Sequence, residues 1–126
     1  MDKKELKVLM VEPGKHPKVT TLKDDLDSLQ RAVSIGADYQ GLIEIISIGN
    51  GDCLLCNEEG KLIGLEGNRR LGNDIIVGVL YILSEDSDGN LVSLSDKKIQ
   101  YYTELFWEPE RFDRTEIEAT LSCHFL

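Results

Sequence analysis

CLLCNEEGKLIGLEGNRRL, residues 53–71, is the segment on which the fold prediction depends. Apolar residues flank the turn-forming residues 57–60, and apolar residues return at 62–65. A four-residue turn that ends in Gly60 is typical of a type I turn followed by a residue in the left-handed conformation. The segment therefore predicts a β-hairpin that runs directly into a pair of arginines, Arg69 and Arg70.

The rest of the chain alternates between short apolar runs and turn signals, with two helical patterns between them. In the first helical pattern Leu26, Leu29 and Val33 share one face after acidic capping residues, and in the second Ser95 is the expected cap. The apolar run at 41–48 carries apolar residues on both faces, which predicts a central strand. We expect strands at 7–12, 19–22, 41–48, 74–83 and 91–93, and helices at 25–35 and from 95 to about 108.

The C-terminal residues 116–126 show strict alternation of polar and apolar side chains. Such a period of two predicts a half-buried strand, which could complete the sheet of the same chain or pair across a homodimer. The order of elements predicts an α+β fold with a mainly antiparallel sheet, two helices and an extra C-terminal strand. We assign residues 1–108 to a single domain and residues 109–126 to a C-terminal extension.

The charge of the chain restricts its partners. The formal net charge is −9 over 126 residues, which argues against binding a nucleic-acid polymer because phosphate contacts need a basic surface. The same charge is compatible with a basic partner protein. No apolar run reaches the length of a membrane-spanning helix, and the start of the chain does not resemble a signal peptide. With three cysteines, an odd number, we expect free thiols and a cytoplasmic location.

The candidate binding site is centred on Asn68, Arg69 and Arg70, which lie between Gly67 and Gly72. Arginine side chains match carboxylate and phosphate oxygens, and neighbouring glycines allow a ligand to approach the backbone. On the predicted hairpin, Asn57 and Lys61 could add an amide and a cation. The sequence thus predicts a site for a small anionic ligand, for example a nucleotide. The alternative is that each arginine pairs with one of the 23 acidic side chains.

Metal binding and catalysis have less support from the sequence. Cys53 and Cys56 have the spacing of zinc ligands, and Cys123 and His124 could complete a site. Residues three apart on a regular strand point to opposite faces, however, so buried and unreactive cysteines are expected instead. His16 and His124 are the only histidines, and neither belongs to a catalytic signature. We therefore predict a protein that is not an enzyme and has no metal or cofactor.

Six stretches of the sequence, in the same order over about residues 7–106, resemble the domain-of-unknown-function 3846 family. They are KVLMVEPGK, SLQRAV, LIEII, CLLCNEEGKLIGLEGNRRL, DIIVGVLYIL and SLSDKKIQ. The family motif falls on Asn57, Glu58, Gly60, Lys61, Asn68 and Arg69. Two segments depart from the family pattern, the longer link at 35–40 and the extension past Trp107.

The resemblance implies a context more than a chemistry. Members of this family are found in phages, plasmids and conjugative elements. The resemblance therefore implies a small accessory protein that acts inside a bacterial host cell. Together with the arginine cluster, this context predicts a non-enzymatic protein that binds an anionic ligand and could sequester a host defence signal. The alternative prediction is an acidic interaction module, an inhibitor or DNA mimic that blocks a host protein.

Overall fold

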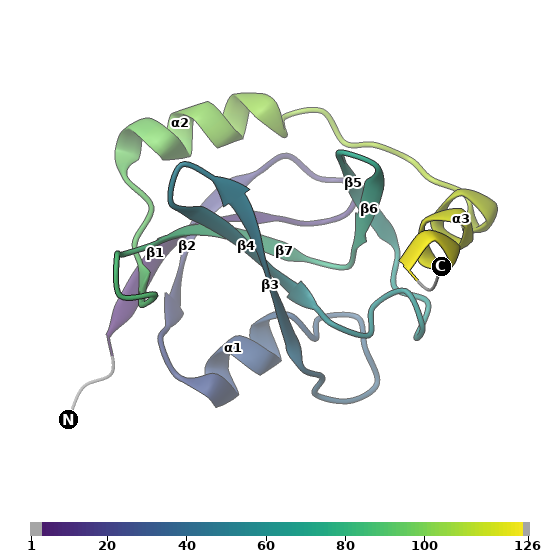
Figure 1. Ribbon diagram of the computed structural model, residues 1–126, viewed down its shortest axis with the longest axis horizontal. Helices are drawn as coiled ribbons and strands as arrows, with labels where there is room; N and C mark the ends of the chain where they lie inside the picture. The colour runs from purple at the N-terminus through teal and green to yellow at the C-terminus, as the bar shows by residue number, and fades with distance from the viewer. Residues whose placement is uncertain (1–3, 125–126) are drawn as a thin grey trace.

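The computed structural model describes residues 4–124, with side chains described through residue 121. Within this range the chain forms eight strands and three helices, in an α+β arrangement (Figure 1). The strands are β1 Glu5–Val11, β2 Lys18–Lys23, β3 Ile43–Gly49, β4 Asp52–Asn57, β5 Gly67–Leu71, β6 Asp74–Val77, β7 Leu80–Glu85 and β8 Leu91–Val92. The helices are α1 Leu26–Ala32, α2 Asp96–Leu105 and α3 Arg114–His124.

The main sheet has six strands, all paired antiparallel, in the order β2-β1-β7-β4-β3, with β8 added beside β7. This confirms the predicted α+β class and the mainly antiparallel sheet. Strand β7 lies at the centre and pairs with β1, β4 and β8. The central position of β7 explains why consecutive residues of this strand are apolar, because both of its faces are covered.

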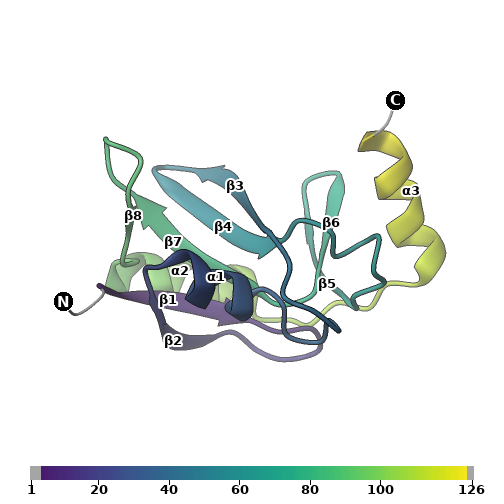
Figure 2. The ribbon, with the colours of Figure 1, turned by 90° about the horizontal axis from the view of Figure 1, so that it is seen from below.

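The two faces of the main sheet are covered by different helices, with α2 on one side and α1 on the other (Figures 1 and 2). Leu80 and Ile82 of β7 pack in the core on the α2 side, together with Leu54 and Cys56 of β4. The alternate residues, including Tyr81 and Leu83, pack in the core on the α1 side. The fold is thus a sheet between two layers of helix, and each layer buries one face.

Both predicted caps are present. The Asp25 carboxylate accepts a hydrogen bond from the backbone N–H of Ser28, and the Ser95 hydroxyl accepts one from the N–H of Lys98. These contacts satisfy backbone donors that have no partner within the first helical turn. Helix α1 ends at Ala32, three residues before the predicted end at 35.

The predicted hairpin between residues 53 and 71 is wrong. Strand β4 pairs with β3 and β7, and residues 58–64 form consecutive turns instead of a returning strand. Within these turns the Leu65 N–H donates to the Gly60 carbonyl at 2.9 Å. Strand β5 instead pairs with β6 in a separate two-stranded sheet. The local turns redirect the chain before it can return beside β4.

The apolar run at 74–83, predicted as one strand, is divided at Gly78. Gly78 has a φ of +72° and donates its N–H to the Glu66 carbonyl at 2.7 Å. Because a left-handed residue turns the chain sharply, β6 joins the small sheet and β7 joins the large one. The position of this bend sets the two sheets beside each other.

Strand β3 was predicted to be central, and this prediction is wrong, because β3 is an edge of the main sheet. Ile46 and Ile48 contact the core on the α2 side, and Ile43 contacts the core on the α1 side. Ile45, in contrast, leaves 52% of its surface exposed. Apolar residues on both faces indicated a central strand, but only part of this strand is covered.

The predicted C-terminal strand is a helix, α3 (Figure 2). Asp113 and Glu116 form a reciprocal capping box. The Glu116 N–H donates to the Asp113 carboxylate at 2.8 Å, and the Asp113 N–H donates to the Glu116 carboxylate at 3.3 Å. Ile117, Thr120 and Leu121 recur at helical spacing, and Ile117 and Thr120 are buried. The alternating pattern therefore coincided with a helical one, and the capping box was the signal that favoured the helix.

Among residues 4–124, no helix combines the length and apolar character needed to cross a bilayer.

Candidate functional site

Asn68 and Arg69, two of the predicted ligand-binding residues, are buried in the interior. The Asn68 amide Nδ2 donates to the carbonyls of Val11 and Gly78, both at 2.8 Å. Arg69 is only 1% exposed. Its side chain lies between β5, the loop after β1 and the end of α2, and burial lowers its pKa.

All five N–H groups of the Arg69 guanidinium have acceptors. Nε and Nη2 donate to the Phe106 carbonyl at 3.1 and 3.0 Å, and Nη2 also donates to the Lys15 carbonyl at 2.7 Å. Nη1 donates to the backbone and side-chain oxygens of Asn68 at 3.1 and 2.9 Å. The guanidinium therefore joins three segments of the chain. For Arg69 to bind an anionic ligand, as the sequence predicts, these hydrogen bonds would have to break.

Arg70 lies on the surface and faces α3. Its Nη2 is 3.5 Å from a Glu116 carboxylate oxygen, and its guanidinium carbon is 5.4 Å from the centre of the Phe112 ring. The Arg70 N–H donates to the Glu110 carboxylate at 2.9 Å. Although adjacent in sequence, Arg69 and Arg70 point to opposite sides of β5, so they do not form one cationic site.

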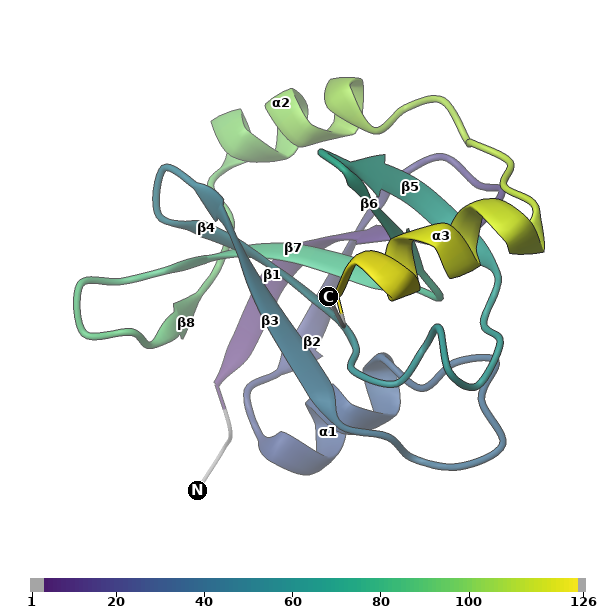
Figure 3. The same ribbon diagram turned by 45° about the vertical axis from the view of Figure 1, so that its right-hand side comes forward.

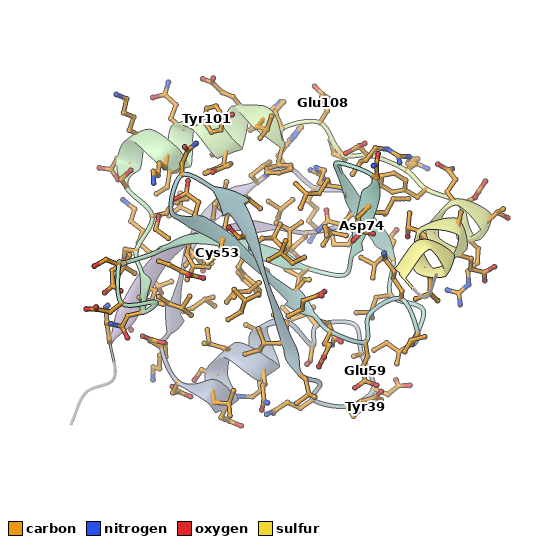
Figure 4. All side chains as sticks on the ribbon, in the orientation of Figure 1. Tyr39, Cys53, Glu59, Asp74, Tyr101 and Glu108 are labelled. Carbon is orange, nitrogen blue, oxygen red and sulfur yellow. The ribbon has the colours of Figure 1, made fainter. Side chains whose placement is uncertain are left out.

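Asn57 and Lys61 lie together at a different place, around the turns after β4. The Asn57 Oδ1 accepts a hydrogen bond from the Glu59 N–H at 2.9 Å, while its buried Nδ2 has no hydrogen-bond partner among the described residues. A Cβ atom on Gly41 would lie 2.8 Å from this Nδ2. Lys61 forms an ion pair with Asp74 of β6. Figure 4 labels Asp74 on this strand. Of the five predicted site residues, only these two border the same cavity.

This cavity has a volume of about 240 Å³ and lies where β3, β4, β6 and α3 meet. Figure 3 shows these four elements around the same region. Its lining combines apolar side chains with polar ones that include three carboxylates and one lysine. We call it the acidic cavity, and it is lined by Glu44, Cys56, Asn57, Glu58, Lys61, Leu62, Asp74, Ile75, Ile76, Val77 and Leu121.

The charges around the acidic cavity favour a positive group. Lys61, the one cation in the lining, is paired with Asp74. The exposed carboxylates of Glu44 and Glu58 therefore have no balancing cation within the lining. The Cys56 thiol lies 3.7 Å from a Glu44 oxygen. Burial, together with the Glu44 charge, raises the pKa of Cys56 to about 12, so this thiol is neutral and unreactive at neutral pH.

A larger hollow of about 330 Å³ lies between the loop after β1 and the turns before β5. Glycine, proline and apolar residues make up most of its lining, and Glu12 and Glu66 are its only charged members. It offers fewer side-chain groups that could orient a ligand. We therefore take the acidic cavity as the candidate site.

A second polar cluster, which the sequence did not indicate, is buried beneath α2. The Asp52 carboxylate accepts hydrogen bonds from Ser84 at 2.8 Å, Lys98 at 2.7 Å and Tyr102 at 2.7 Å. Burial opposes ionisation of Asp52, but these three hydrogen bonds outweigh it and lower its pKa. No cavity described above is lined by these residues, so the cluster attaches α2 to β4 and β7. The sequence does not indicate this cluster, because the partners of Asp52 lie 32 to 50 residues further along the chain.

The described side chains hold no group of three or more His, Cys, Asp or Glu residues arranged to bind a metal ion. Cys53 packs in the core on the α1 side and Cys56 in the core on the α2 side, as expected for strand residues three apart. Cys123 and His124, which could have completed a zinc site, have side chains outside the described residues. His16 stacks on Trp107 with ring centres 3.9 Å apart and contacts the Trp107 carbonyl at 2.6 Å.

Comparison with known proteins gives a family but no activity. No curated protein and no solved structure matches the chain. The model of the family described as a domain of unknown function (DUF3846) matches residues 6–107, which covers the main sheet, the small sheet and both α1 and α2. Helix α3, which supplies Leu121 to the acidic cavity, lies outside the matched residues. The chain belongs to the DUF3846 family.

Proposed function

We propose that this protein is a non-enzymatic binding protein whose acidic cavity holds a small ligand with a positively charged group. The observation that carries the proposal is the lining of the cavity, in which Glu44 and Glu58 are additional to the Lys61–Asp74 pair. An amine or guanidinium could pair with these carboxylates while its carbon chain packs on Ile76 and Leu121.

The size of the cavity limits the ligand. Pockets for drug-sized ligands measure roughly 300 to 1,000 Å³, and the acidic cavity measures about 240 Å³. A diamine or a small guanidinium compound is therefore a better candidate than a nucleotide. The proposal changes the expected charge of the ligand, because Arg69 and Arg70 already have acceptors within the chain.

The mobile-element context suggested by the family resemblance gives such a binder a use. An accessory protein that holds a small host metabolite would lower its free concentration in the host cell. Sequestration needs binding and no chemistry, which agrees with a Cys56 thiol that stays protonated at neutral pH.

Thermal-shift and calorimetric titrations with putrescine and agmatine test the proposal, with AMP as the nucleotide comparison. We expect the amines to raise the melting temperature and AMP to leave it unchanged. The double variant Glu44→Gln, Glu58→Gln should lose the shift. Glu59→Gln is the matched control, because Glu59 lies in the same loop without lining the cavity. Stabilisation by AMP alone, or amine binding that survives the double variant, would contradict the proposal.

A second function remains a candidate because the chain carries a net charge of −9. In this alternative the acidic surface binds a basic host protein, and a lysine or arginine of that partner enters the acidic cavity. Pull-down from host lysate at low and high salt tests it, since a contact between surface charges weakens as salt screens it. Free agmatine should compete with such a partner if both use the cavity.

A further inference from the structure

We propose that the free edge of β3 pairs with β3 of a second copy of this chain, which joins two main sheets into one. The proposal uses the outward-facing backbone of β3, whereas the proposed function uses the Glu44 side chain of the same strand, so different variants test the two proposals. It begins with the difference between the two edges of the main sheet.

The opposite edge, β2, has features that discourage pairing, whereas β3 does not. Strand β2 has a lysine at each end, Lys18 and Lys23, and charged edge residues oppose pairing between sheets. Strand β3 has a single charged residue, Glu44, and contains neither proline nor lysine. Ile45, in its middle, is 52% exposed. A seven-residue edge strand with one charged residue and no proline is a template for another strand.

The pairing of β3 with β4 determines which backbone groups of β3 face outward. The Glu58 N–H donates to the Leu42 carbonyl at 2.9 Å, and bonded residues alternate along an antiparallel pair. In the register of the two strands, Glu44 and Ile46 therefore bond inward to β4. The N–H and carbonyl groups of Ile43, Ile45 and Ser47 point away from the sheet.

A second copy fits this edge in an antiparallel register centred on Ile45. Ile43 then pairs with Ser47 of the second copy, Ile45 with its own equivalent, and Ser47 with Ile43, so all three outward-facing residues form bonded pairs. Glu44 lies opposite an uncharged residue, Ile46 of the second copy. Centring the register on Glu44 would place two carboxylates opposite each other, which is unfavourable. In this register the bonding patterns of the two edges match, and no two charged side chains of β3 lie opposite each other.

The net charge predicts how this pairing responds to salt. Two chains of charge −9 repel each other, and the repulsion weakens as the Debye length falls from roughly 30 Å at 0.01 M salt to roughly 3 Å at 1 M. Salt should therefore strengthen association between copies. A basic peptide on the same edge would respond in the opposite direction, so salt dependence distinguishes the two occupants.

Sedimentation and light scattering of the full chain, from about 10 µM to about 1 mM, measure the association. We expect a dimer fraction that rises with protein and salt concentration, and its loss in Ile45→Lys. A chain that stays monomeric over this range, or a dimer that Ile45→Lys leaves intact, would overturn the proposal. Circular dichroism checks that the variant, which alters a half-exposed residue, keeps its fold.

Disulfide trapping tests the register in a Cys123→Ser background. Cα atoms of a bonded antiparallel pair lie about 5.5 Å apart, within the range of a disulfide, so Ile45→Cys should crosslink on oxidation. Ser47→Cys faces Ile43 of the second copy and should crosslink at least about tenfold more slowly. Val19→Cys, on the β2 edge and 49% exposed, is the matched control for random collision. Equal crosslinking rates for the three variants would overturn the register.

Discussion

The Arg69 guanidinium donates two hydrogen bonds to the main-chain carbonyl of Phe106, at 3.1 Å from Nε and 3.0 Å from Nη2. Phe106 is the C-cap residue of α2, where helical carbonyls lack partners within the helix. The same guanidinium reaches the Lys15 carbonyl at 2.7 Å. Arg69, which the sequence indicates as a ligand-binding residue, thus joins the small sheet to α2 and to the loop after β1.

Replacing Arg69 by Lys should destabilise the fold by roughly 2 to 4 kcal/mol, because a single ammonium cannot satisfy acceptors arranged around a planar fork. Urea unfolding followed by circular dichroism measures the change. Arg70→Lys is the matched control, since Arg70 makes an exposed ion pair, of a kind worth about 0 to 1 kcal/mol. If the two variants lose equal stability, Arg69 does not have the structural role described here.

The features that the sequence predicted well depend on neighbouring residues. The caps at Asp25 and Ser95 need only a donor three residues on, and β1 and β2 are joined by a short turn. The apolar runs located β1, β2, β3 and β8, whereas the run at 74–83 did not show the division into β6 and β7. Local chemistry thus fixes where these elements begin.

The pairing of the remaining elements depends on contacts far along the chain, which a pattern of residues does not encode. The partners of Arg69 at Phe106 and Lys15 are 37 and 54 residues away. Asp52 lies 50 residues from Tyr102. The acidic cavity needs β3, β6 and α3 to converge, so only Asn57 and Lys61 of its lining had been identified as site residues.

Gly78 divides the apolar run into β6 and β7, and Gly78→Ala should cost more stability than an alanine at another left-handed position. A Cβ there would lie 2.8 Å from Leu65 Cδ1, in addition to the roughly 1 to 2 kcal/mol cost of a left-handed alanine. Gly72→Ala is the control, because Gly72 has a φ of +59° and no atom within 4 Å of its added Cβ. The difference between the two measures the contact with Leu65.

The double variant Gly78→Ala, Leu65→Ala separates the two causes. Removing the leucine methyl groups should relieve the contact but not the backbone strain, so the two substitutions should cost less together than the sum of their separate effects. Thermal unfolding of the four proteins in the cycle gives the interaction free energy. Strict additivity would show that the side chain of Leu65 moves aside without cost.

Asp52→Asn should reduce stability at neutral pH and flatten the acid limb of the stability curve. Hydrogen bonds from Lys98, Tyr102 and Ser84 outweigh burial and hold the Asp52 pKa below its ordinary value of 3.8. The unfolded state therefore takes up a proton first as the pH falls. The stabilisation is complete above about pH 4 and is lost as the pH falls through the lowered folded-state pKa.

Urea unfolding at several pH values between about 2.5 and 7 measures this effect as a difference between wild type and variant. Asp86→Asn is a useful comparison, since backbone N–H groups at Asn90 and Asp88 also lower the Asp86 pKa but the carboxylate is exposed. We expect the smaller pH dependence from Asp86. A wild-type acid limb that Asp52→Asn leaves unchanged would contradict the structural role of this cluster.

Cys53 and Cys56 should resist thiol reagents while the chain is folded. Burial is the main cause that raises the pKa of each to about 12, with added repulsion from Glu85 at Cys53 and from Glu44 at Cys56. Both thiols are therefore protonated at pH 8 and are shielded by the two cores. In a Cys123→Ser background, a colorimetric thiol reagent should react with neither cysteine in buffer and with both in denaturing urea.

The same raised pKa values make the fold sensitive to alkali. The unfolded thiols ionise near pH 9, whereas the folded ones stay protonated up to about pH 12. The stability due to these thiols is thus complete below pH 9 and declines as the pH rises from 9 toward 12, because the unfolded state releases protons first. Cys56→Ala should weaken that decline relative to wild type, at the cost of a smaller side chain in the core. A thiol that reacts rapidly in the native chain would show that the acidic cavity opens wide enough to admit the reagent to Cys56.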